Sequence, residues 1–138
     1  MTLTPAQIEQ FVDDLYAATA VGDFDKAADM LTDDFFVTEA DNLPMAGIYR
    51  GRNALKELFT KVMGLMDVAG LERVQTLVGG DYAVTYLSFR FADPALKSAE
   101  LCELFRFRDG KCCEIKPFYF DPATVHAAVA AKQAALTA

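Results

Sequence analysis

Two glutamates, Glu39 and Glu103, have surroundings in the sequence that suit acid/base chemistry. The run DDFFVTE has the composition of a strand, and in a strand Glu39 shares its face with Val37. In the run AELCELFRFR, Glu103 shares its face with Leu101 and Phe105. Each acid therefore stands on an otherwise apolar face of a different predicted strand.

Two carboxyl groups in one apolar interior would differ in protonation. Burial disfavours the charged form of a carboxyl group, and a second acid nearby disfavours it further. One acid can then be ionised and accept a proton, while the other stays neutral and donates a hydrogen bond. This division suits the removal of a proton beside a carbonyl group, where negative charge develops on the oxygen.

The surroundings of Glu103 depend on the register of the last predicted hairpin. A two-residue loop at 109–110 would place Glu114 and Lys116 on the face of Glu103. A three-residue loop at 108–110, with a left-handed glycine, keeps that face apolar. We favour the three-residue loop, which brings Cys113, Ile115, Pro117 and Tyr119 to the face of Glu103.

Capping signals predict two helices ahead of the first strand. Thr4 and Gln7 form a capping box around a first-turn proline, and an apolar stripe follows until Gly22. Asp23 then caps a short second helix. We expect this helix to end at the double acid 33–34.

The rest of the chain reads as a loop, a helix, four strands and a final helix. Residues 41–51 contain Pro44 and two glycines, which indicate an irregular loop. A third helix follows Gly51, and its apolar stripe includes Leu58 and Val62. Four β-rich runs come next, joined by hairpins, and an alanine-rich helix begins at Pro122.

Length and charge narrow the classes of function. A chain of 138 residues fits one domain, 1–138, and the 53% of hydrophobic residues favour an internal cavity or a subunit interface. The net charge of -7 argues against nucleic acid and against anionic membrane surfaces. No run is apolar enough for a membrane helix, and the start of the chain lacks the features of a signal peptide.

The three cysteines fit neither a disulfide framework nor a zinc site with paired spacing. We therefore expect reduced thiols, a cytoplasmic protein and no metal site. The single histidine, His126, is expected to be structural.

The order of these elements resembles a known family. GDFDKAADMLTDDFFVTE, a Pro/Gly loop, a helix and four strands are similar to the SnoaL-like and ketosteroid-isomerase-like members of the nuclear transport factor 2-like superfamily, over about Ile8 to Pro122. The resemblance implies an α+β fold in which a cone-shaped, curved, mixed or antiparallel sheet wraps around a pocket. Three helices from the N-terminal half and a C-terminal helix complete this fold, which commonly forms a homodimer.

The resemblance also implies roles for the two acids. Counting from GDFD, Glu39 falls where the isomerases keep their general base, and Glu103 in CELFRF falls where they keep the protonated acid of the oxyanion hole. At the position of the family's helix tyrosine the count gives Leu15, and Tyr16 is rotated from it by about 100°. The family's phenol is then either missing or replaced by the hydroxyl of another tyrosine, Tyr49 or Tyr119.

The expected activity is cofactor-free acid/base chemistry on a small hydrophobic carbonyl compound: isomerisation, cyclisation, hydration or dehydration. Glu39 and Glu103 are the expected catalytic residues, with no metal and no cofactor. The alternative is a noncatalytic module of the same fold that binds a hydrophobic ligand or dimerises. The residues expected to contact the ligand are Leu15, Tyr16, Tyr49, Leu58, Val62, Phe105, Ile115 and Tyr119.

Overall fold

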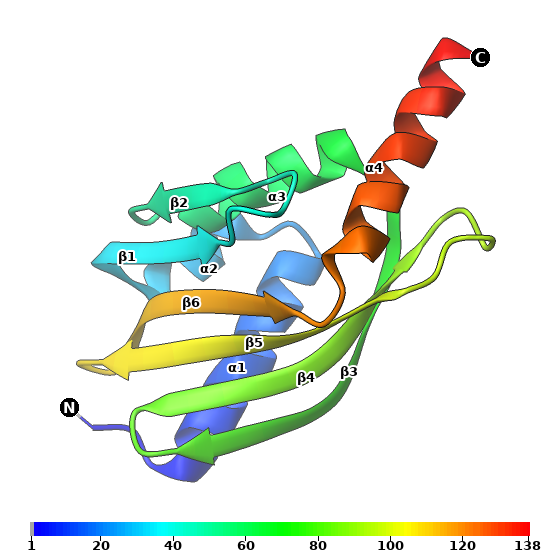
Figure 1. The fold of residues 1–138 in the computed structure, drawn as a ribbon. Helices are drawn as coiled ribbons and strands as arrows, with labels where there is room; N and C mark the ends of the chain where they lie inside the picture. The colour runs from blue at the N-terminus through cyan, green and yellow to red at the C-terminus, as the bar shows by residue number, and fades with distance from the viewer. Residues whose placement is uncertain (1) are drawn as a thin grey trace.

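A six-stranded sheet in the order β2-β1-β6-β5-β4-β3 organises residues 2–138, the part of the chain that this computed structural model describes (Figure 1). Four helices accompany it, so the expected α+β class is confirmed. None of these helices is long and apolar enough to cross a membrane. In chain order the elements are α1 (Pro5–Ala20), α2 (Phe24–Asp29), β1 (Leu31–Glu39), β2 (Gly47–Arg50), α3 (Ala54–Leu65), β3 (Val68–Gly79), β4 (Tyr82–Phe91), β5 (Ala99–Arg108), β6 (Lys111–Tyr119) and α4 (Pro122–Thr137).

The sheet is curved, open and mixed. The strands β3 to β6 pair antiparallel in sequence order, as the turn signals predicted. The first strand then joins β6 in parallel, with Val37 opposite Ile115. In Figure 1, α1 passes behind β4 and β5. The ring of Phe11 on α1 meets Phe107 on β5 edge to face at 5.1 Å, which places α1 against the inner face of the sheet.

The first helix begins and ends where its capping residues predict. The Gln7 backbone N–H donates to Thr4 Oγ1 at 3.2 Å, and the Thr4 N–H donates to Gln7 Oε1 at 2.9 Å. Beyond the helix, Gly22 adopts a φ of 73°, which a glycine reaches without steric cost. Ile8 and Val12 are buried, so the apolar stripe faces the sheet.

The predicted boundary between the second helix and the first strand was wrong. The helix ends at Asp29 and β1 already begins at Leu31, rather than after the double acid. Leu31 is fully buried and pairs with Cys112 on β6. Pairing is irregular between Leu31 and Phe36, so the two acids at 33–34 stay exposed inside a strand.

A short strand lies in the segment predicted to be an irregular loop. Residues Gly47–Arg50 form β2, which pairs antiparallel with β1 and places Gly47 opposite Glu39. The local sequence does not predict this strand, because it is stabilised by the free edge of β1 rather than by its own propensity.

The last hairpin has the predicted face but not the predicted loop. Its loop has two residues, Asp109 and Gly110, with φ of 54° and 76°, as the tightest hairpin turns require. A bulge then shifts the register, because Phe107 pairs with Cys112 while Arg106 pairs with Glu114. The bulge, and not a longer loop, places the apolar residues of β6 on the face of Glu103. Glu103 therefore lies opposite Pro117, with Phe105 opposite Ile115 and Leu101 opposite Tyr119.

Candidate active site

Glu39 lies at the end of β1 with its side chain on the inner face of the sheet. It shares that face with Phe35 and Val37, both buried, and only 3% of the residue is exposed. Within residues 2–138, its Oε1 has no hydrogen-bond partner. Burial raises the pKa of Glu39 to about 8, and the negative charge of Glu103 contributes to the increase. The carboxyl is therefore available for a proton or a ligand.

Glu103 lies in the middle of β5 on the same inner face. Its neighbours across the sheet are Thr85 on β4, which is fully buried, and Pro117 on β6. The residue is half-buried. Burial raises the pKa of Glu103, and a hydrogen bond from Tyr16 acts in the opposite direction.

The hydroxyl beside Glu103 comes from Tyr16 on α1. The Tyr16 hydroxyl donates to Glu103 Oε1 at 2.5 Å, and its ring meets Phe105 edge to face at 5.8 Å. Burial, followed by the charge of Glu103, raises the pKa of Tyr16, so the phenol keeps its proton. Counting along the sequence had assigned this position to Leu15, which instead is buried in the core.

Tyr49 and Tyr119 lie near the acids but occupy different positions from Tyr16. The Tyr49 hydroxyl on β2 donates to the backbone oxygen of Met45 at 2.7 Å, in the loop ahead of this strand. Burial raises the pKa of Tyr119, and the charges of Glu39 and Glu103 raise it further. Tyr119 is therefore within electrostatic range of both acids.

The other residues expected to contact a ligand belong to the hydrophobic core. Val62 is half-buried against this core, whose buried members include Leu15, Leu58, Phe105 and Ile115. Their contact with a ligand stays a prediction.

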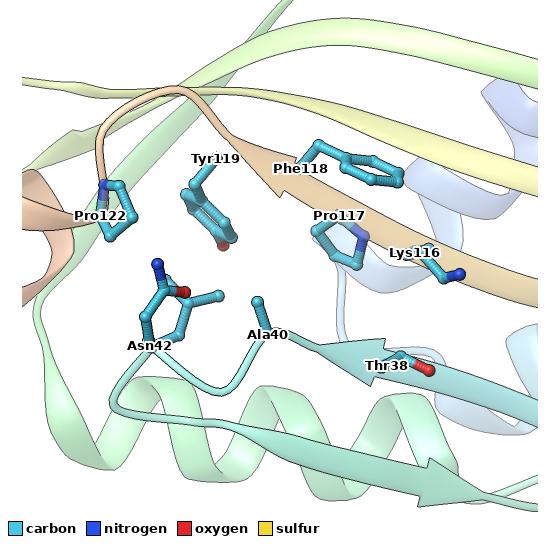
Figure 2. A pocket seen from close by; sticks show the side chains of 9 residues that line it. Thr38, Ala40, Asn42, Lys116, Pro117, Phe118, Tyr119 and Pro122 are labelled. Carbon is cyan, nitrogen blue, oxygen red and sulfur yellow. The ribbon is translucent and has the colours of Figure 1, made fainter.

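A groove of about 240 Å³ opens where β1 and β6 separate (Figure 2). The two strands stay paired as far as Val37 and Ile115 and then separate. Figure 2 shows Tyr119 pointing from the end of β6 toward the loop that holds Ala40 and Asn42. The groove is lined by Thr38, Ala40, Asn42, Leu43, Lys116, Pro117, Phe118, Tyr119 and Pro122.

A second groove, of about 400 Å³, lies over β4 and β5 near Tyr86 and Glu100. Of the two acids, neither is among the described residues that line these grooves. Tyr119 lines the first groove, and the charges of both acids raise its pKa. An open pocket that reaches both acids stays a prediction.

The sequence reasoning missed two residues of this cluster. Thr85 is fully buried, and its hydroxyl lies 2.9 Å from that of Thr76. In YAVTYLSF, Thr85 alternates with Ala83 and Leu87, and this pattern predicts that all three side chains point inward. The second is Arg73, whose guanidinium carbon lies 4.6 Å from the centroid of the Tyr16 ring. Nothing in the local pattern marks Arg73, because a bulge in β3 sets its direction.

Comparisons with known structures identify the fold. A nuclear transport factor 2-like protein from Burkholderia xenovorans has a TM-score of 0.73 at 19% identity, over 91% of this chain and 98% of the other. TerC co-crystallised with polyporic acid has a TM-score of 0.75 at 16% identity, over 92% and 99%. A de novo designed protein with a curved β-sheet has a TM-score of 0.71 at 13% identity, over 91% and 94%.

These likenesses establish the nuclear transport factor 2-like fold, and the designed protein illustrates that this fold alone does not define an activity. None of the curated proteins matched the sequence. The family model of the SnoaL-like domain matches residues 12–115, which include both acids and Tyr16. The chain therefore belongs to the SnoaL-like domain family.

Proposed function

We propose that this protein is a cofactor-independent enzyme that moves a proton on a small hydrophobic carbonyl compound. One observation carries the proposal. Two carboxyl groups, the buried Glu39 and the half-buried Glu103, lie on the same face of the sheet, and Glu103 already accepts a hydrogen bond from the half-buried Tyr16. Such perturbed acids are typical of sites where protons are transferred.

In the proposed mechanism, the two acids hold one proton between them, and substrate binding places it on Glu103. Ionised Glu39 then takes a proton from the carbon beside the carbonyl group. The electrons of that C–H bond move toward the carbonyl oxygen, which becomes negative. When substrate binds, the Tyr16 hydroxyl turns from Glu103 to this oxygen, and the neutral form of Glu103 donates a second hydrogen bond to it. Return of the proton to another carbon completes an isomerisation. In a cyclisation, the new carbanion attacks a second carbonyl group, and the proton on Glu39 passes to the alkoxide that forms.

The pKa of Glu39 sets the pH range of this chemistry. At about 8, it leaves Glu39 mostly protonated at neutral pH in the unliganded protein. Its carboxylate form, the base, therefore increases as pH rises through 8. We expect turnover to rise over the same range.

We propose that the substrate approaches along the groove between β1 and β6. Tyr119 lines this groove and is within electrostatic range of both acids, so a change in its side-chain rotamer would connect the two. The core residues beside the acids, including Phe105 and Ile115, would then contact the apolar part of the ligand. The co-crystallisation of TerC with polyporic acid supports small-molecule binding by this fold.

The test begins with the compound that the protein carries. Small molecules are extracted from purified protein and identified by mass spectrometry, and they are then assayed for turnover beside a panel of carbonyl compounds. Glu39→Gln should bind the compound as the wild type does and lose turnover, while Glu72→Gln, an exposed acid on β3, keeps it. Binding without turnover by any protein would support the noncatalytic module instead.

We also propose that a second copy of the chain covers the outer face of the sheet. This face carries exposed apolar side chains, among them Leu77 at 65% and Phe118 at 55% exposure. Homodimers are common in the family that the chain resembles. Analytical ultracentrifugation should find a dimer, and Leu77→Lys should shift it toward a monomer. A monomeric wild type would contradict this proposal.

A further inference from the structure

An arginine occupies the inner face of β3 because of a β-bulge. Arg73 pairs with Leu87, whereas the next pair is Gln75 with Tyr86, so Val74 is an extra residue. Leu87 is fully buried on the inner face, and Arg73 opposite it shares that face. Val74 is 60% exposed. The bulge therefore brings a positive charge to the side of the sheet where α1 packs.

The Arg73 side chain contacts α1 at two positions. Its guanidinium carbon lies 4.6 Å from the centroid of the Tyr16 ring. Its Nη1 lies 2.8 Å from Asp13 Oδ1. Asp13 and Tyr16 are three residues apart and lie side by side on the helix surface. One guanidinium thus holds both the ring of Tyr16 and the helical turn that precedes it.

We propose that Arg73 is a positioning residue that fixes the rotation of α1 and so keeps the Tyr16 hydroxyl on Glu103. A hydrogen bond of 2.5 Å requires the donor to be placed within a few tenths of an ångström. The hydroxyl is at the far end of the long Tyr16 side chain, so a small rotation of α1 about its axis displaces it from Glu103. The catalytic consequence rests on the proposed function, while the effect on the hydrogen bond does not.

The charge of Arg73 also acts on the phenol itself. Burial and then the charge of Glu103 raise the pKa of Tyr16, and the positive charge of Arg73 opposes them. A phenol with a less elevated pKa is a stronger hydrogen-bond donor. The same contact that orients the ring therefore strengthens the bond to Glu103.

The hydroxyl proton of Tyr16 provides a direct measurement. A short hydrogen bond between a phenol and a carboxyl group gives a proton NMR resonance far downfield, and Tyr16→Phe identifies it by its loss. In Arg73→Met this resonance should move upfield and broaden, whereas Arg73→Lys, which keeps the charge, should restore part of the shift. Asp13→Asn should give an intermediate result, because it removes the ion pair and leaves the ring contact.

Arg50→Met is the matched control. The Arg50 guanidinium carbon lies 6.0 Å from the centroid of the Phe36 ring, so this variant removes an arginine from an aromatic ring away from Tyr16. An unchanged resonance in Arg73→Met relative to Arg50→Met would overturn the inference. If Arg73→Met does not fold, Asp13→Asn and Arg73→Lys are compared with the same control, and unchanged resonances in both would overturn it equally.

Kinetics separate this inference from the proposed function. With an active substrate, Arg73→Met should lower kcat about threefold to tenfold and leave KM nearly unchanged, because it misplaces a donor that matters in the transition state. If the wild type turns over no substrate while the resonance still responds to Arg73→Met, the proposed function fails and the positioning role stands. A normal kcat in Arg73→Met would contradict the catalytic part.

Discussion

The strand β5 carries two Tyr–Glu hydrogen bonds on opposite faces. On the inner face, Tyr16 donates to Glu103 at 2.5 Å, and on the outer face, Tyr86 donates to Glu100 at 2.8 Å. Their electrostatic settings differ. For Tyr16 burial is the largest cause of its raised pKa, whereas for the exposed Tyr86 it is the hydrogen bond to Glu100.

The comparison shows that burial, rather than the pairing of a phenol with a carboxylate, distinguishes the candidate site. Glu103 has its pKa raised by burial and lies near a second enclosed acid, Glu39. Glu100 is exposed, so water stabilises its charge. The outer pair therefore supplies a natural control for every substitution in the inner pair.

The largest expected contrast is in turnover. Glu103→Gln removes the acid that would donate to the developing negative charge and should lower kcat by about 100-fold or more. Glu100→Gln should stay within about twofold of the wild type, because an exposed acid on the far face has no part in the chemistry. Steady-state kinetics on the compound found bound to the protein measure both. Equal losses in the two variants would abolish the distinction between the faces.

The second contrast is in stability as a function of pH. The pKa of Glu39 rises from an ordinary value of 4.5 to about 8 on folding, so between these values the folded protein binds a proton that the unfolded chain has released. The free energy of unfolding therefore falls as pH rises through this range. Glu39→Gln cannot ionise, so at pH 9 it should be more stable than the wild type by roughly 3 to 5 kcal/mol, and by much less at pH 5.

Urea unfolding at the two pH values measures this difference. Glu100 is exposed, so Glu100→Gln should change the free energy of unfolding little at either pH. An equal effect of Glu39→Gln at pH 5 and pH 9 would mean that Glu39 titrates normally in the folded protein.

The smallest contrast is in the titration of Glu39 itself. Carbon-13 NMR of labelled glutamate carboxyl groups should give a Glu39 midpoint near 8. Because part of this increase comes from the charge of Glu103, Glu103→Gln should lower the midpoint, and Glu100→Gln should leave it in place. A midpoint that stays fixed in Glu103→Gln would show that the two acids do not interact.

Local signals were sufficient to predict most of the fold. The capping box at Thr4 and the proline at Pro122 marked helix starts, and the turn signals marked the hairpins that join β3 to β6. The short strand β2 was missed because its existence depends on a partner strand rather than on its own residues. The start of β1 was missed because irregular pairing with β6 leaves two adjacent acids exposed inside the strand, which strand alternation does not predict.

The acids and the tyrosine were predicted with different success for a physical reason. Alternation in a strand has only two outcomes, so the inward direction of Glu39 and Glu103 followed from their apolar neighbours. A helix offers a continuous range of directions, so an offset of one residue moved the assignment from Tyr16 to Leu15. Which residue meets Glu103 is decided by how α1 packs, and Arg73, from a distant strand, contributes to that packing.

The bulge at Cys112 and Cys113 determines which residues of β6 lie opposite the inner face of β5. It is the reason that Ile115, Pro117 and Tyr119, rather than their neighbours, stand beside β5 on the inner face. A regular two-residue hairpin without this bulge would invert the strand and bring Lys116 opposite Glu103, turning an apolar surrounding into an ion pair. Loss of the bulge alone would thus replace the apolar surroundings of Glu103, without altering either glutamate.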